Sequence, residues 1–539
     1  TCFFSYTGDA LDKKTPLLRS LDEISREALR ILRLFGDTDT QRVQVSVGAE
    51  QEYFLIPKAL YAQREDLRLT GRTLFGAYAP KGQELDDHYF GTIRTRVANF
   101  MKDLDEQLWR LGVLSKTKHN EGAPCQHELA PIYTDVNTSC DDNQLIMLTM
   151  KKCAAKHNLV CLLHEKPFAG ISGSGKHNNW SLGTDTGKNL FSPGKTPYQN
   201  ARFLLFLAAF IKGVDEYQEL LRCTVASAGN DHRLGANEAP PAIISIFLGD
   251  ELNAIIRSIV DGTNYVDPDK SLLRIGVDVL PPIRKDTTDR NRTSPFAFTG
   301  NKFEFRSLGS SQNIAMPNVV INTAVAKVLS DMADTLEAAV AKGEDFQKAV
   351  AAVIKDTLAA HKRIIYNGNG YSQEWMAEAA RRGLSNLRTT VESCEVLTSE
   401  KSVELFTRFG VLSAVELHAR QEILLENYAK VLNIEAQTMA LMTTRQIIPA
   451  VEAYITKLGK AARAKMDVLG GDTACVRMER ELITRLSTLN TAAYDAVAAL
   501  IREDREATSA GNALAVAMAF RDKVVPAMAA LRASVDEME

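Results

Sequence analysis

Apolar and polar residues alternate along residues 43–56, VQVSVGAEQEYFLI, and this period of two predicts a β-strand. Glu50 and Glu52 stand two residues apart, and residues i and i+2 of a strand point to the same face. The strand therefore offers two carboxylates to one space. Two carboxylates on a half-buried face repel each other, and a bound cation relieves that cost. The alternative is an edge strand whose glutamates face water.

Apolar residues recur at intervals of three and four in other stretches, and this spacing predicts amphipathic helices. One such helix lies within residues 1–41 and stops at Gly36. A second, TRVANFMKDLDEQLWRLG, is closed by Gly112. The apolar run FLLFLAAFI at 203–211 is about half a membrane span, so we expect a core helix there.

After Pro317 the chain is rich in Ala, Leu, Glu and Lys, and its apolar stripes predict one helix after another. Ser413 and Glu416 match a capping box ahead of a long helix that Pro449 would kink or end. We expect these stripes to form the core of a helical bundle rather than a ligand site.

The 539 residues are 45% apolar and 24% charged, which is typical of a globular protein of several domains. A formal net charge of −3 gives no sign of a nucleic-acid-binding surface, and no run is long enough to predict a membrane span. The eight cysteines include no CxxC pair and fit reduced thiols. We therefore expect a cytoplasmic protein, or one of an organelle stroma if the organism is eukaryotic. No signal peptide is visible, and the chain opens at Thr1, so we expect that an N-terminal piece has been cut away or left out.

Two further acids flank a turn in HNEGAPCQHELAP, residues 119–131. Glu121 and Glu128 stand seven apart around a glycine and a proline, and such a bend can bring both carboxylates to one point. Taken alone the signal is weak, because many surface turns have this composition.

A third segment, GISGSGKHNNWSLG, places His177, Asn179 and Ser181 alternately on one predicted strand face. It lacks the GxxxxGK[ST] spacing of a phosphate-binding P-loop. A single histidine on a strand is more often a satisfied core residue than a ligand. Beside several acids, however, a neutral imidazole becomes a good ligand for a divalent ion.

Two later segments carry arginines. HRLGANEAPPAII places Arg233 and Glu238 in a Gly/Asn/Pro loop with the composition of a mobile flap. In NKFEFR, Lys302, Glu304 and Arg306 share one strand face while two phenylalanines pack behind them. This pattern fits the wall of an active site, and a cross-strand ladder of ion pairs is the alternative.

Together these segments contain six candidate metal ligands and three arginines suited to planar anions. They are Glu50, Glu52, Glu121, Glu128, His177, Glu304, Arg233, Arg292 and Arg306. Six oxygen and nitrogen ligands suffice for two divalent ions that share a site. Arginines around them would hold an anionic substrate and a phosphoryl group in transfer. The pattern predicts metal-dependent phosphoryl transfer to an anionic acceptor.

In this order, the segments resemble those of glutamine synthetase, and specifically its long type III form. The matching stretches are AEQEYFL, NEGAPCQHE, GSGKHNNWSL, RLGANEAP, and NRTSP followed by NKFEFR. The helical tail, SYTGDALDKKTPLLRS near the start and YNGNGYSQEW at 366–375 point to type III.

The resemblance implies an α+β fold with a curved, mostly antiparallel sheet, flanking helices and a large helical C-terminal extension. We expect a helical lead-in at 1–41, the glutamine synthetase catalytic domain at 42–340, and the extension at 341–539. It also implies a homo-oligomer of hexameric rings stacked as a dodecamer, with sites between subunits. The family's N-terminal β-grasp domain supplies an aspartate for ammonium and closes the neighbouring subunit's site. This sequence does not contain that domain, which leaves open whether the chain as given is active.

The implied reaction is ATP-dependent ligation of ammonia to L-glutamate through γ-glutamyl phosphate, giving glutamine, ADP and phosphate, with two or more Mg²⁺ or Mn²⁺ ions per site. By resemblance, the first ion is held by Glu52, Glu121 and Glu128, and the second by Glu50, His177 and Glu304. The other implied residues are Gly173, Arg233 and Arg306 for the substrate, Arg292 and Arg306 for the phosphoryl group, Glu238 for shielding and proton acceptance, and Asn179, Ser181, Arg292 and Lys302 for the nucleotide.

The chain departs from the family's pattern at several positions. Asn179 stands where many members have a second histidine, and Ser172 where many have asparagine. The flap is one residue shorter than in better-known forms, and no arginine stands between Arg292 and Glu304. Two alternatives therefore accompany the main prediction: a related γ-glutamyl-amine ligase, and a catalytically silent homologue used for assembly or regulation.

Overall fold

The computed structural model describes residues 2–265, 272–273, 283–284, 293–471 and 473–539. Arg292, predicted to contact the nucleotide and the phosphoryl group, lies outside the described residues.

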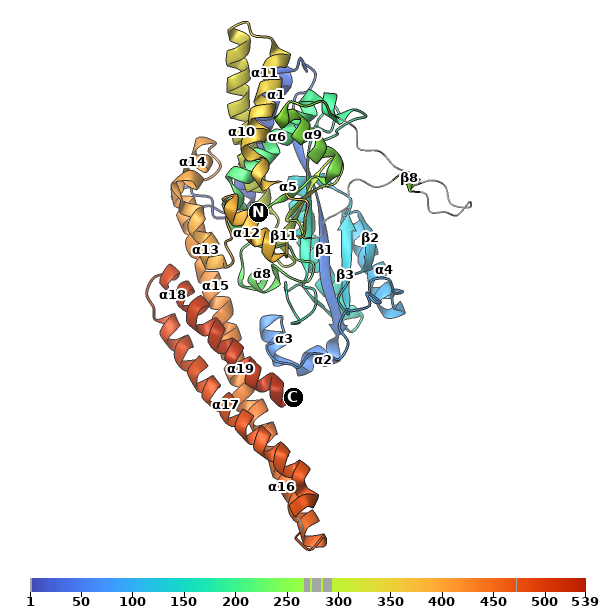
Figure 1. Cartoon of the computed structure of the whole chain (residues 1–539), viewed down its shortest axis with the longest axis vertical. Helices are drawn as coiled ribbons and strands as arrows, with labels where there is room; N and C mark the ends of the chain where they lie inside the picture. Colours follow the sequence, from blue (N-terminus) through green and yellow to red (C-terminus); the bar gives the residue numbers. More distant parts are fainter. Residues whose placement is uncertain (1, 266–271, 274–282, 285–292, 472) are drawn as a thin grey trace.

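A nine-stranded sheet forms the centre of the fold (Figure 1), in the order β2-β3-β1-β6-β11-β10-β7 with β4 and β5 also paired to β1. Its strands are β1 (Val43–Pro57), β2 (Ser115–Asn120), β3 (Gln126–Pro131), β4 (Thr134–Asp135), β5 (Leu159–Leu162), β6 (Gly175–Thr184), β7 (Ile246–Phe247), β10 (Phe296–Phe298) and β11 (Phe303–Gly309). The pairings of this sheet are antiparallel except for β10 with β7. The predicted α+β class with a mostly antiparallel sheet and flanking helices is confirmed. Two short strands, β8 (Leu272–Leu273) and β9 (Ile283–Arg284), pair separately.

Strand β1 begins with the alternation that its sequence predicts. Val43, Val45 and Val47 are buried in the main hydrophobic core. Tyr53 and Leu55 contribute to a second core, together with residues of the helices that follow β1 and β4. Because both faces of its second half are covered, β1 holds its carboxylates at fixed positions within the sheet.

Helices surround the sheet over the first two thirds of the chain. They are α1 (Lys14–Leu34), α2 (Lys58–Gln63), α3 (Glu65–Thr70), α4 (Thr95–Arg110), α5 (Val136–Lys156), α6 (Ala201–Glu216), α7 (Gln218–Thr224), α8 (Ala228–Arg233), α9 (Gly249–Asp261), α10 (Ala315–Ala341) and α11 (Phe346–His361), with 3-10 turns η1 (Pro197–Gln199) and η2 (Lys362–Ile364). The apolar run at 203–211 forms the buried middle of α6, so the predicted core helix is confirmed.

Phenylalanines from α6 and β10 support strand β11 from behind. The Phe303 ring stacks on Phe210 with centroids 3.6 Å apart, and the Phe305 ring stacks on Phe296 at 4.2 Å. These contacts fix one face of β11, so Glu304 and Arg306 are held on the other face.

The rest of the chain is helical, as predicted. Its helices are α12 (Gln373–Arg381), α13 (Thr390–Cys394), α14 (Glu400–Arg408), α15 (Ala414–Met442), α16 (Ile448–Val468), α17 (Arg477–Thr508), α18 (Ala513–Ala519) and α19 (Val525–Met538), with 3-10 turns η3 (Glu395–Thr398) and η5 (Thr473–Val476) and π-turns η4 (Thr443–Ile447) and η6 (Phe520–Val524). The capping box of Ser413 and Glu416 is present at the start of α15. Pro449 stands in the first turn of α16, directly after η4, so the predicted interruption is confirmed.

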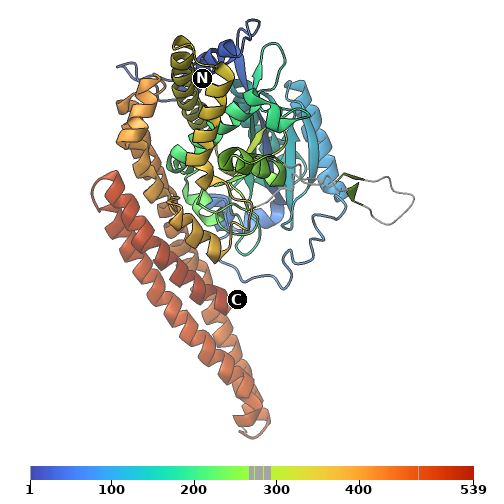
Figure 2. The same cartoon turned by 45° about the horizontal axis from the view of Figure 1, so that its top comes forward.

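The C-terminal helices form a long rod that projects from the body of the molecule, with α16 and α17 at its far end (Figures 1 and 2). Helix α19 returns along this rod toward α2 and α3. The described helices include none that is both long enough and apolar enough to cross a membrane.

Candidate metal centre

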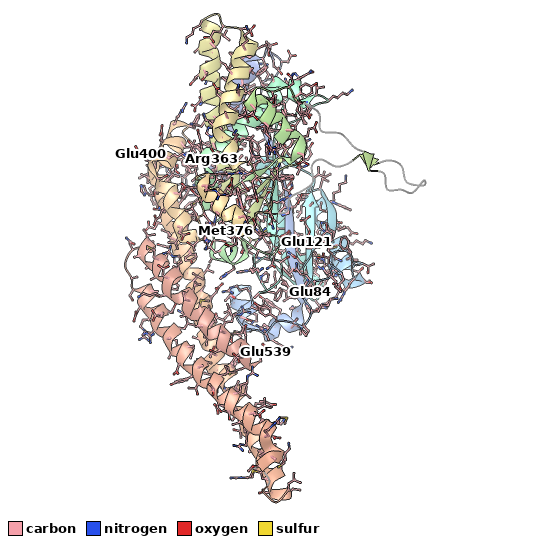
Figure 3. All side chains as sticks on the ribbon, in the orientation of Figure 1. Glu84, Glu121, Arg363, Met376, Glu400 and Glu539 are labelled. Atoms are coloured by element: carbon pink, nitrogen blue, oxygen red, sulfur yellow. The ribbon has the colours of Figure 1, made fainter. Side chains whose placement is uncertain are left out.

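A cavity of about 140 Å³ opens on the sheet and gathers acidic, imidazole and guanidinium groups. The side chains that line it are Glu50, Glu52, Tyr89, His119, Glu121, Glu128, His177, Glu238, Glu304 and Arg306. All six predicted metal ligands are among them. Figure 3 marks Glu121, which lies beside β2 and β3 on the sheet side of the molecule.

The register of the sheet explains why residues far apart in sequence meet here. Glu128 of β3 lies opposite both Glu52 of β1 and His119 of β2. Glu50 lies opposite His177 of β6. Since directly opposite residues on neighbouring strands share a face at close range, these side chains form a stripe across four strands.

The donor atoms of this stripe form two overlapping groups. In one, donor atoms of His119, Glu121 and Glu128 lie within 4.8 Å of one another, and His119 Nε2 is 3.1 Å from Glu128 Oε1. In the other, donor atoms of Glu50, Glu128 and His177 lie within 4.8 Å of one another. Glu128 belongs to both groups, which is the arrangement expected of a site for two neighbouring ions.

Burial and mutual repulsion of the acids raise several pKa values. Burial, followed by the charges of Glu52 and Glu128, raises the pKa of Glu121 to about 8. Burial also raises the pKa of Glu128, although its hydrogen bond with His119 acts in the opposite direction. That hydrogen bond raises the pKa of His119 to about 9. A divalent cation favours ionised carboxylates and neutral imidazoles, so this donor set fits such an ion.

On the opposite side of the cavity, Glu304 is surrounded by cationic partners. His177 Nδ1 lies 2.9 Å from Glu304 Oε1, and Arg306 Nε lies 3.2 Å from the same oxygen. Burial would raise the pKa of Glu304, but the hydrogen bond and charge of His177 and the charge of Arg306 lower it overall. Glu304 is therefore an ionised acceptor at neutral pH.

The residues predicted to contact the nucleotide differ from one another in their contacts: of those that the structure describes, only Asn179 bonds to a carboxylate of the centre. Asn179 Nδ2 donates to Glu50 Oε1 at 2.9 Å and so orients one carboxylate of the centre. Ser181 Oγ donates to the carbonyl of Asn301 at 2.7 Å. Lys302 directly precedes β11. The described residues that line the cavity include neither Lys302 nor Ser181.

Arg233 and Gly173, both predicted to bind the substrate, lie behind the cavity rather than on its lining. Arg233 is 3% exposed, and its two terminal nitrogens donate to the carbonyls of Leu308 and Arg306 at 3.1 and 3.2 Å. A Cβ atom on Gly173 would come within 2.3 Å of the Glu165 carbonyl oxygen, so only glycine fits there.

The loop that carries Glu238 is held in an unusual backbone conformation. Asn237 and Glu238 have φ of 53° and 67°, values that residues other than glycine adopt only when the surroundings enforce them. The hydroxyl of Tyr371 donates to the carbonyl of Ala239 at 2.9 Å, which ties the loop to the C-terminal region. Glu238 lines the cavity from this loop.

Two residues that were not predicted from the sequence, His119 and Tyr89, also line the cavity. His119 stands two residues before Glu121, the same spacing that relates Glu50 to Glu52, so this spacing was a signal for it, although Glu121 lies just beyond the end of β2. Tyr89 lies in a turn-rich segment, where no periodic pattern predicts the direction of a side chain.

The chain is similar in sequence to known proteins. The family description "Glutamine synthetase, catalytic domain" matches residues 26–257, and "Glutamine synthetase C-terminal domain" matches residues 349–466. The chain is 48% identical to a glutamine synthetase of Butyrivibrio fibrisolvens, over 100% of this chain and 76% of the relative. It is 44% identical to a type-3 glutamine synthetase of Dictyostelium discoideum, over 100% of this chain and 74% of the relative.

Among solved structures, the glutamine synthetase of Plasmodium falciparum aligns with 61% of this chain and 58% of its own, at 15% identity and a TM-score of 0.43. The relatives in sequence are similar over the whole of this chain, and they include a type-3 member. The chain therefore belongs to the glutamine synthetase family.

Proposed function

We propose that the protein ligates ammonia to L-glutamate at the expense of ATP, through γ-glutamyl phosphate, and releases glutamine, ADP and phosphate. The observation that supports this proposal most directly is the convergence of Glu50, Glu52, Glu121, Glu128, His177 and Glu304 with Arg306 on one cavity. A site that combines carboxylates for divalent ions with a guanidinium for an anion suits phosphoryl transfer to a carboxylate.

Glu52, Glu121 and Glu128 would hold one Mg²⁺ or Mn²⁺ ion, and Glu50, His177 and Glu304 a second. When bound, these ions would supply neutralisation of the ATP phosphates and of the charge that develops during transfer. Donor atoms of Glu128 lie within 4.8 Å of those of Glu121 and also of those of Glu50 and His177, so Glu128 stands between the two proposed sets. Asn179 donates to the Glu50 carboxylate and orients it.

Arg306, with Arg292, would bind the phosphoryl group and the substrate carboxylate. Arg306 pairs through Nε and Nη2 with the two carboxylate oxygens of Glu304, at 3.2 and 3.3 Å, and this pairing holds the guanidinium on the cavity lining. Binding an anion would require Arg306 to exchange part of this pairing for the anion's oxygens. Arg292 is proposed for this role from its sequence motif alone.

Glu238 would shield the acyl phosphate from water and accept a proton from the ammonium-derived nitrogen. Its side chain reaches the cavity from a conformationally constrained loop, which suits a residue that closes over an intermediate. Asn179, Ser181 and Lys302 are proposed for the nucleotide side, and Gly173 and Arg233 for the amino-acid end of glutamate. For Arg233 this role requires it to exchange its present bonds to β11 for substrate oxygens.

The proposal is tested by measuring phosphate release from ATP with glutamate and ammonium, with and without Mn²⁺. We expect release that requires all four components and yields glutamine. Release that requires another amine would support a γ-glutamyl-amine ligase instead, and Mn²⁺ binding without any turnover would support the silent homologue.

Replacement of Glu304 by alanine is a sharper test of the centre. Because Glu304 contacts both His177 and Arg306, we expect Glu304→Ala to abolish turnover while the assembly state stays unchanged. Glu378→Ala, which removes a partly exposed acid that pairs with Arg381 on α12, is the matched control and should retain activity. Full activity in Glu304→Ala would refute the assignment of Glu304 as a metal ligand of the centre.

We also propose that the protein forms hexameric rings stacked as a dodecamer. Strand β2 is an edge strand of the sheet, and large apolar side chains are exposed beside it: Leu111, Leu114, Ile132 and Tyr133. An exposed sheet edge flanked by apolar side chains is a surface that another chain commonly covers. Mass photometry should find a twelve-subunit particle, and Leu114→Lys combined with Ile132→Lys should shift the population toward smaller species.

A further inference from the structure

A second group of metal-ligating side chains lies on the helix pair α4–α5. Cys153 and His157 stand four residues apart on α5 and at its end, so they face the same direction. Asp103 approaches them from α4. Donor atoms of the three residues lie within 4.8 Å of one another, and none of the three lines the cavity described above.

The spacing of these donors matches that of a small tetrahedral site. Cys153 Sγ lies 3.3 Å from Asp103 Oδ2, and His157 Nε2 lies 3.1 Å from the same oxygen. Donors bonded to Zn²⁺ at about 2.0 to 2.3 Å in tetrahedral geometry lie roughly 3.3 to 3.5 Å from one another. The two separations at Asp103 therefore fit such an ion within a few tenths of an ångström, and the Cys153 and His157 donors lie within 4.8 Å of each other.

The surroundings hold the donors in place. Gln107 Nε2 donates to Asp103 Oδ1 at 2.9 Å, which leaves Oδ2 directed toward Cys153 and His157. The guanidinium of Arg96 donates to the carbonyl of His157 at 3.2 Å and fixes the end of α5. Partners of this kind, which orient a ligand from outside, are characteristic of metal sites in proteins.

The group is also reachable from solvent. The Cys153 side chain is buried, whereas the side chains of His157 and Asp103 are 24% and 32% exposed. A cation can thus approach from the Asp103 side and keep water as its fourth ligand.

From this geometry we propose that Asp103, Cys153 and His157 form a binding site for one borderline divalent cation of the Zn²⁺ type. A set of one thiolate, one imidazole and one carboxylate favours Zn²⁺ or Co²⁺ over the harder Mg²⁺. On binding, the Cys153 thiol releases its proton to solvent and its sulfur bonds to the ion. The alternative is a purely hydrogen-bonded triad with no affinity for a metal.

The test uses Co²⁺ as a spectroscopic probe on the reduced full chain, with excess Mg²⁺ to occupy the carboxylate centre. Only a thiolate ligand gives an intense sulfur-to-cobalt charge-transfer band in the near ultraviolet, so the carboxylate centre is silent in this region. We expect one equivalent of Co²⁺ to produce the band and Zn²⁺ to displace it.

Cys153→Ser should remove the band, whereas Cys161→Ser, which alters another buried cysteine of the same core, should retain it. Gln107→Leu should weaken Co²⁺ binding roughly tenfold to a hundredfold, because it frees the Asp103 carboxylate to rotate. If Cys153→Ser does not fold, His157→Gln tests the site independently, and it should also reduce the intensity of the band.

No band in the parent chain, or an unchanged band in both Cys153→Ser and His157→Gln, would overturn the proposal. Ligase activity with Mg²⁺ alone is measured in parallel, so a failure of this site is distinguishable from a failure of the proposed reaction.

Discussion

His119 lies between two carboxylates of the candidate centre, 3.1 Å from Glu128 and 3.5 Å from Glu121. Its ring either binds an ion directly or orients both acids. In either case we expect His119→Ala to weaken Mn²⁺ binding roughly tenfold to a hundredfold, measured by isothermal titration calorimetry. His361→Gln is the control, since His361 pairs with Asp215 on α6, away from the cavity. Mn²⁺ binding that is unchanged or tighter in His119→Ala would contradict a ligand role.

At the residue scale, the sequence predicts best those side chains whose direction follows from local periodicity. Glu50, Glu52, His177 and Glu304 were found because strand alternation fixes the face on which each one lies. Arg233 shows the limit, because its buried guanidinium bonds to carbonyls of β11, more than seventy positions away along the chain. Local periodicity carries no information about such a partner.

Helix α15 is joined to the catalytic part by a buried ion pair. Arg72, in the loop after α3, contacts Glu435 through two hydrogen bonds, of which the one from Nε measures 2.9 Å. Burial alone would raise the pKa of Glu435, but the charge and hydrogen bonds of Arg72 lower it overall. The pair therefore stabilises the folded state only while Glu435 is ionised.

We expect Glu435→Gln to destabilise the protein by about 3 to 5 kcal/mol at neutral pH, because it leaves the Arg72 charge buried without its partner. Since the folded pKa of Glu435 is depressed, the stabilisation is fully present above the ordinary glutamate value of about 4.3 and is lost as the pH falls through the lower folded value. Thermal unfolding should show the difference in Tm between parent and variant narrowing below about pH 4. Glu426→Gln, at an exposed acid on α15, is the control. A difference in Tm that stays constant with pH would contradict this account.

At the element scale, the sequence predicted most helices and the central strand but could not predict how they join. The break between α15 and α16 was signalled by Pro449, yet the chain continues through the π-turn η4 in nearly helical conformation. Proline removes one backbone hydrogen-bond donor and fixes one backbone dihedral, φ. The direction of the following helix depends instead on its packing against α17.

At the scale of the whole molecule, the helical extension contacts the catalytic part through α15 and α19, while the far end of the rod projects away from it (Figure 1). The main core contains residues from α1, the sheet and the start of α15. The C-terminal end of α19, part-way along the rod, reaches the loop at 73–77, where Asp536 accepts from the Gly76 amide at 2.8 Å. The division at 341, which accompanies the family resemblance, remains a prediction.

Arg532 of α19 is positioned to hold this loop closed, since it pairs with Asp536 at 2.8 Å and donates to the carbonyls of Thr73 and Gly76. A hydrogen bond to a charged group contributes about 1.5 kcal/mol or more, which corresponds to roughly a tenfold change in the population of an open state. We therefore expect Arg532→Ala to speed hydrogen exchange of the amides at 73–77 about tenfold, measured by mass spectrometry. Arg485→Ala removes an arginine of α17 that pairs with exposed Glu537, and it should leave this exchange unchanged. If both variants exchange like the parent, α19 does not hold the loop, and the two parts of the molecule are coupled through Arg72 and Glu435.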